Sequence, residues 1–132
     1  MVVYENNSIT ITYAPETDSI LVAWPGTEPY TLPEIKESLH KLLEIITNYN
    51  AKNLVIDAMN AKVNVDYQEY LQVVKNTMYE LNKTHLQKVA RVLSADPERE
   101  AIQDAANQNF RFNFQFQNFK SRAEAVKWIS KS

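Results

Sequence analysis

A single glycine, Gly26, is present among the 132 residues of this chain, where average usage would supply about nine. Phosphate-binding loops, dinucleotide-binding turns and nucleophile elbows all need glycine where the backbone takes a positive φ or approaches a ligand closely. None of these sites can be built here in its usual form. The chain also has no cysteine, and His40 and His85 are its only imidazoles. Because the usual nucleophiles and metal ligands are scarce, we expect no cofactor, no metal centre and no enzymatic activity.

The charged residues are typical of an ordinary soluble surface. The formal net charge is −2, the pI is near 5.7, and the positive residues form no cluster in the sequence. Nucleic acid is therefore excluded as a partner, because that binding rests on a clustered positive surface. The N-terminus lacks the basic and apolar regions of a signal peptide, and no apolar run reaches about 18 residues. We predict a cytoplasmic protein without a membrane span.

Hydrophobic periodicity along the chain alternates between about 2 and about 3.6 residues, which predicts both strands and helices. Two β-branched and apolar runs, residues 9–13 and 20–24, predict a β-hairpin. Amphipathic stretches then alternate with short apolar runs. Each amphipathic stretch follows a residue that is favourable as a helix N-cap. The predicted N-caps are Thr31, Asp66, Asp96 and Ser121.

The short apolar runs predict the remaining strands. Residues 53–58 and 89–93 have the continuous apolar character of buried parallel strands, with the former near the centre of the sheet. Phenylalanines alternate with polar residues over 110–116, which predicts a half-buried edge strand. The expected order is β-β-α-β-α-β-α-β-α. We predict an α/β fold in a single domain over residues 1–132, with a mixed, mostly parallel five-stranded sheet and four packed helices.

Three segments carry a resemblance to a known family. Residues 20–26 (ILVAWPG), 53–57 (NLVID) and 123–129 (AEAVKWI) together resemble the SpoIIAA-like, or STAS-like, family of small bacterial proteins. The resemblance spans nearly the whole chain and rests mainly on the order of elements. It implies a STAS-type fold, related to the anti-sigma-factor antagonists and to the cytoplasmic domains of anion transporters. It implies no established catalytic activity.

The chain departs from the regulatory members of that group at one position. Those members carry a phosphorylatable serine at the start of the helix after the third predicted strand, where added charge acts as a switch. Here no Ser or Thr occurs between Thr47 and Thr77. We therefore expect a STAS-like binding domain that works as a regulatory or protein-interaction module without the serine switch. The alternative is a protein that binds a small molecule or a lipid-like ligand.

Asp57 follows the central predicted strand, where open α/β sheets usually bind their ligands. The favoured interpretation is structural: Asp57 caps a turn or accepts backbone N–H groups. A more distant alternative makes Asp57 a phosphoacceptor similar to that of response-regulator receivers, with Ser94 and Lys120 as polar helpers. The acidic residues near the third helix, such as Glu100, are interpreted as capping and solvated groups.

Aromatic and polar residues at the same end of the sheet are interpreted first as packing in the core, and the functional alternative is a shallow binding groove. Its predicted occupant is a protein segment or a small amphipathic ligand. The phenylalanine-bearing edge strand could also pair with a second copy, so a homodimer is expected as a further outcome. The six residues predicted to form the groove are Trp24, Tyr30, Asp57, Met59, Asn60 and Tyr67.

Overall fold

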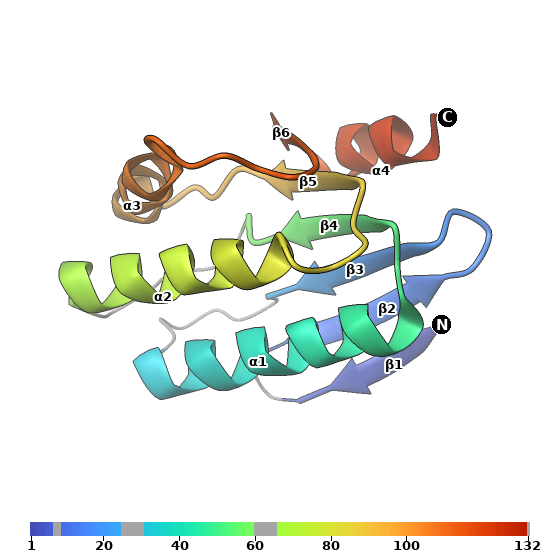
Figure 1. Ribbon diagram of the computed structural model, residues 1–132, viewed down its shortest axis with the longest axis horizontal. Coiled ribbons are helices and arrows are strands. Elements are labelled where there is room, and N and C mark those ends of the chain that lie inside the picture. Colours follow the sequence, from blue (N-terminus) through green and yellow to red (C-terminus); the bar gives the residue numbers. More distant parts are fainter. Residues whose placement is uncertain (7–8, 25–30, 60–65, 132) are drawn as a thin grey trace.

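The computed structural model describes residues 1–6, 9–24, 31–59 and 66–131. Within these ranges the strands are β1 (Val2–Glu5), β2 (Thr10–Ala14), β3 (Ser19–Ala23), β4 (Asn53–Asp57), β5 (Lys88–Val92) and β6 (Gln115–Phe119). The helices are α1 (Leu32–Tyr49), α2 (Tyr67–Leu81), α3 (Pro97–Asn107) and α4 (Arg122–Ser130). The strands form one sheet in the order β1-β2-β3-β4-β5-β6 (Figure 1). β1, β2 and β3 pair antiparallel, and β3 to β6 pair parallel, so the prediction of a mixed sheet is confirmed.

The four helices begin at the residues that the sequence predicts. Thr31 forms a complete capping box with Glu34, in which each side chain accepts from the other residue's backbone N–H. The side chains of Asp66, Asp96 and Ser121 each accept backbone N–H groups from the first turn that follows. These bonds satisfy donors that have no partner inside the helix, which is why the helix starts could be located from short polar motifs.

The sheet has one strand more than the predicted five. β1 pairs antiparallel with β2, and its register shifts between Val2 and Tyr4. No β1 side chain is fully buried, because the strand forms an edge of the sheet. A short edge strand with an irregular register gives little of the alternation on which sequence prediction depends.

The last strand also differs from its prediction. β6 begins at Gln115, so Phe110, Phe112 and Phe114 lie in the connection that precedes it. Burial still alternates along this connection as predicted, because the phenylalanine rings pack on one another and on Phe116 while the residues between them are exposed. The rings of Phe112 and Phe116 stack with centroids 4.7 Å apart. An extended connection can therefore show the period of a strand without pairing as one, while β6 itself is an edge strand as expected.

The two faces of the sheet are covered by different helices. α1, α2 and α3 contribute to the larger hydrophobic cluster, which includes Val22, Leu54 and Val89. α4 packs on the other face, where its Ala125 and Ile129 join a smaller cluster. Figure 1 shows α1 and α2 lying alongside each other across the sheet. The central position of β4, between β3 and β5, is as the sequence predicts.

Candidate functional site

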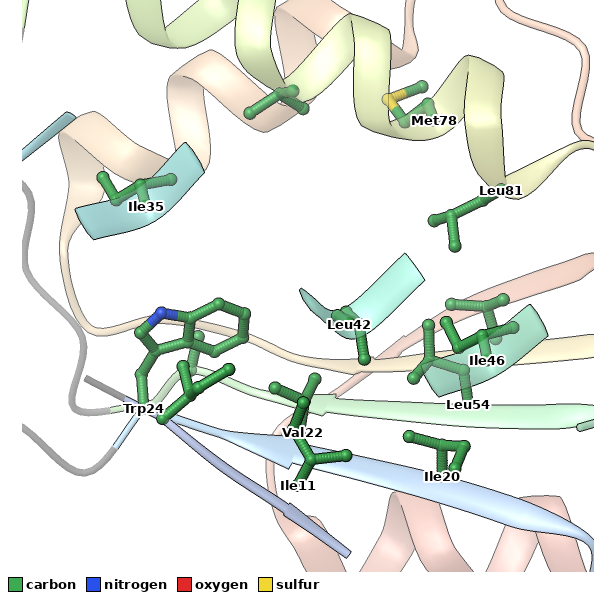
Figure 2. Close-up of a cluster of buried hydrophobic side chains, with 14 of the residues drawn as sticks. Ile11, Ile20, Val22, Trp24, Ile35, Leu42, Ile46, Leu54, Met78 and Leu81 are labelled. Carbon is green, nitrogen blue, oxygen red and sulfur yellow. The ribbon is translucent and has the colours of Figure 1, made fainter. Parts of the chain in front are cut away.

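The larger core holds a cavity of about 80 Å³ between the sheet and helices α1 and α2. This volume is several times the ~10–15 Å³ that one water molecule requires. Ile35, Leu39 and Leu42 line it from α1, at the spacing that places residues on one helix face. In Figure 2 the Trp24 indole extends from the sheet towards the helices, and Met78 and Leu81 approach from α2.

Aromatic rings close the cavity near the last strand. Phe112, Phe114 and Phe116 all line it, and each is only half-buried. On the outer side, Leu39 of α1 and Thr77 of α2 line both the cavity and a shallower surface groove between the two helices. The cavity therefore lies close to the protein surface along this helix pair.

A buried ion pair lies at the cavity wall. Arg91, the fourth residue of β5, lines the cavity with only 2% of its surface exposed. Its two terminal nitrogens donate to the two carboxylate oxygens of Glu100, each at 2.7 Å. The backbone N–H of Ser94 also donates to Glu100, at 2.8 Å. Burial acts to raise the pKa of Glu100, but the Arg91 bonds and charge, with the Ser94 N–H, leave it below its ordinary value of 4.5.

A second arginine at the same wall is incompletely satisfied. Arg99 of α3 is 8% exposed, and its Nε donates to the hydroxyl of Tyr70 at 3.1 Å. Its Nη1 lies 3.8 Å from Glu100 Oε2, which is beyond hydrogen-bond distance. Nη1 is buried and has no hydrogen-bond partner. Two guanidinium groups thus share one carboxylate beside an apolar cavity.

The six predicted groove residues are placed differently from one another. Trp24 is buried, with 7% exposed, and lines the cavity. Met59 packs with the α4 cluster on the other face of the sheet, so these two side chains do not meet. Tyr67, at the start of α2, is 39% exposed. Tyr30 and Asn60 lie outside the described residues.

Asp57 makes the contacts expected of a structural residue. Its Oδ1 accepts the backbone N–H of Met59 at 3.3 Å, which fixes the turn after β4. Its Oδ2 accepts Nε of Arg122 at 2.6 Å, which joins this turn to the start of α4. Ser94, one of the helpers in the receiver-like alternative, instead accepts a hydrogen bond from the backbone N–H of Asp96.

Arg91, Arg99 and Glu100 are the site residues that sequence reasoning missed. The acidic residues of the third helix are interpreted from the sequence as capping and solvated groups. Asp96 does cap α3, but Glu100 is turned inward to the two arginines. The available signal is Arg91 itself, since a charged residue between two buried apolar residues of a strand requires a buried partner.

Two further features are absent from the described part of the chain. In residues 1–6, 9–24, 31–59 and 66–131, no group of three or more His, Cys, Asp or Glu side chains could hold a metal ion. Over the same part of the chain, no helix combines the length and the apolar character required to cross a membrane.

The comparisons with known proteins identify the fold. No protein-family model matches the sequence, and no curated protein matches it significantly. A crystal structure of an uncharacterized DUF3478-family protein with a SpoIIAA-like fold, from Shewanella loihica PV-4, is similar with a TM-score of 0.54 and 15% identity. The match covers 98% of this chain and 99% of that one. The SpoIIAA-like α/β fold implied by the sequence resemblance is therefore confirmed.

A second structure matches less closely. It is the crystal structure of the diguanylate cyclase SiaD in complex with its activator SiaC, from Pseudomonas aeruginosa. The TM-score is 0.46 at 10% identity, with 90% of this chain and 99% of that chain covered.

Proposed function

We propose that this protein is a binding domain that holds a small, largely apolar molecule in the cavity between α1, α2 and the sheet. The cavity itself supports the proposal. Protein interiors contain few voids larger than a water molecule. Side chains around an unfilled space in the core lack packing partners on that side, which reduces stability. A ligand that fills this space would recover the lost contacts.

The proposal requires no chemical reaction. The carboxylates of Glu100, beside the cavity, and Asp57, at the end of β4, are both held in ion pairs with arginines. A carboxylate fixed in this way orients its surroundings and is a poor acid, base or nucleophile. The proposal takes up the small-ligand alternative from the sequence. The protein-interaction module and the homodimer stay predictions.

The test is a titration with phenylpropanol, a neutral probe with one aromatic ring. Trp24 lines the cavity and Trp128 packs on the other face of the sheet, so a Trp128→Phe background reports on the cavity alone. We expect saturable binding that changes the Trp24 fluorescence. Val74→Phe places a ring in the cavity and should weaken binding at least about tenfold.

The matched control is Val126→Phe, the same substitution at a position of α4 that is 41% exposed. It should leave the affinity for phenylpropanol unchanged. Both variants are first checked by thermal unfolding, so that a loss of binding is not a loss of fold. No fluorescence change at saturating probe, or equal affinity in Val74→Phe and wild type, would overturn the proposed function.

A further inference from the structure

We propose that the ligand is a small monocarboxylic acid, with its carboxylate bound by Arg99 and its apolar part in the cavity. The inference rests on the proposed function and adds the chemical class of the ligand. Arg99 and Tyr70 both line the cavity, so the head group and the apolar part would share one continuous site. Three observations carry the assignment: an unsatisfied donor, an unbalanced charge and the shape of the surrounding wall.

The unsatisfied donor is Nη1 of Arg99. Buried polar atoms nearly always have a hydrogen-bond partner, so each exception needs an explanation. Nη1 is buried and unpartnered, although Arg99 is 8% exposed and its Nε is held by Tyr70. The Tyr70 hydroxyl uses its oxygen as the acceptor in that bond, so its own proton can still be donated. Nη1 itself has no surface open to the cavity, so binding requires the guanidinium group of Arg99, a residue that lines the cavity beside Tyr70, to turn towards the ligand.

The unbalanced charge is the positive charge of the Arg99 guanidinium group. Arg91 and Arg99 carry two positive charges, and Glu100 supplies one negative charge between them. Glu100 already accepts both Arg91 nitrogens and the Ser94 N–H, which leaves Arg99 Nη1 at 3.8 Å. The carboxylate of Asp96 is occupied by backbone N–H groups at the start of α3. A monoanion beside Arg99 would bring this cluster to neutrality.

The rest of the wall limits the size and character of the ligand. Leu39, Phe112 and Phe114 line the cavity, and a space of about 80 Å³ leaves room for no more than one ring or a short chain. A planar carboxylate matches the edge of one guanidinium group. A phosphate dianion would leave a second negative charge without a partner, because Arg91 is fully engaged by Glu100. The site therefore favours an aromatic or short aliphatic monocarboxylate.

The test compares phenylpropanoate with phenylpropanol, which share the same apolar body and differ in the head group. Affinities are measured by calorimetry near neutral pH for wild type, Arg99→Met and Arg99→Lys. We expect wild type to bind the acid about tenfold or more tightly than the alcohol, because charge-assisted hydrogen bonds are the stronger kind. Arg99→Met should abolish this preference without weakening alcohol binding, and Arg99→Lys should retain part of it.

Arg111→Met is the matched control, since Arg111 is exposed and does not line the cavity. It should leave the preference for the acid unchanged. Ligand-free Arg99→Met should unfold at the same temperature as wild type or higher, because the substitution removes an unpaired buried donor. Equal loss of both ligands together with a lower unfolding temperature would show a merely structural arginine and overturn the inference.

The wild-type comparison decides the matter even if Arg99→Met does not fold. Equal affinities for acid and alcohol would overturn the carboxylate assignment and leave the proposed function standing. Binding of neither probe would overturn both.

Discussion

The two faces of the sheet differ in how completely they are filled. On the α4 face, small residues such as Ala90 and Ala125 are fully buried and allow the helix to approach the strands closely. On the face covered by α1, α2 and α3, larger side chains surround a cavity. One sequence thus places small, fully buried residues on one face of the strands and a cavity on the other. The unfilled face is where we place the binding function.

The polar groups on the two faces also differ in how completely their hydrogen bonds are satisfied. On the α4 side, Lys88 Nζ donates to the backbone oxygens of Trp128 and Lys131, at 3.2 and 2.6 Å. These bonds satisfy carbonyl groups at the end of α4, so this partly buried amine has a structural explanation. On the cavity side, Arg99 keeps a donor with no partner. A satisfied network stabilises the fold, and an unsatisfied donor beside a cavity indicates a ligand.

The largest effect on stability is expected from Glu100→Gln. The substitution leaves Arg91 and Arg99 buried without a counter-charge, and removing one partner of a buried pair costs about 3–4 kcal/mol. Urea unfolding measures the loss. The exposed pair of Lys41 and Glu44 provides the control, because Glu44→Gln should change stability by less than about 0.5 kcal/mol. Equal losses from both substitutions would contradict the role assigned to Glu100.

The same carboxylate makes stability depend on pH. Because the pKa of Glu100 is lower in the folded state than its ordinary value of 4.5, its contribution is present above that value. The contribution is lost as the pH falls through the lower, folded pKa. Wild type should therefore lose stability relative to Glu100→Gln on acidification below about pH 4.5. Parallel curves of unfolding free energy against pH for the two proteins would contradict this expectation.

The closely packed face is tested by Ile129→Ala. Ile129 is 5% exposed and packs with Val55 and Val92, so its truncation should leave a new void and cost about 2–3 kcal/mol. Binding of phenylpropanol in the cavity should not change, since the substitution lies on the other face. Val126→Ala, at an exposed position of the same helix, should cost little. A loss of probe affinity in Ile129→Ala would show that the two faces are coupled.

Sequence reasoning succeeded where a local pattern determines local structure. The N-caps Thr31, Asp66 and Ser121 could be predicted because a capping side chain bonds to backbone only two or three residues away. The helix faces and the central strand follow from periodicity in the same way. The phenylalanine segment, residues 110–116, shows where prediction from periodicity fails. Burial alternates along the whole segment, although only the part from Gln115 onwards pairs with β5. Alternation reports which side chains face the core, and pairing depends on distant residues.

The cavity could not be predicted for a different reason. Its apolar lining residues look the same in the sequence as residues of a filled core, and only the three-dimensional packing shows the remaining volume. Arg91 and Glu100 lie on β5 and α3, and the direction of the Glu100 side chain is not encoded in the acidic pattern around it. Asp57 could be interpreted correctly as a turn-fixing residue because its Met59 contact is local.

A smaller effect is expected where Asp57 joins β4 to α4. Arg122 is about half exposed, so solvent screens its attraction to the Asp57 carboxylate. Asp57→Asn should cost about 1 kcal/mol, mostly through the bond to the Met59 N–H that a neutral side chain accepts less strongly. The double variant with Arg122→Gln should cost little more than Asp57→Asn alone. Phosphate recovered on Asp57 after incubation with acetyl phosphate would instead support the receiver-like alternative.

The smallest and most direct comparison uses one strand and one type of substitution. Val89 and Val92 both belong to β5, and both are 0% exposed. Val89 lines the cavity and Val92 packs beneath α4, so each reports on one face. Isoleucine keeps the β-branched shape that suits a strand and adds one methylene group.

Val89→Ile should raise stability by about 0.8 kcal/mol, because the added methylene enters existing space. Val92→Ile should lower stability by about 1 kcal/mol, because the closely packed face must distort to accept it. Denaturant unfolding of the two variants and wild type measures this difference in sign. Val89→Ile should also weaken the binding of phenylpropanol by reducing the volume available to it, whereas Val92→Ile should not. Destabilisation by both substitutions would mean that the cavity face is as closely packed as the α4 face, and the binding function would lose its physical basis.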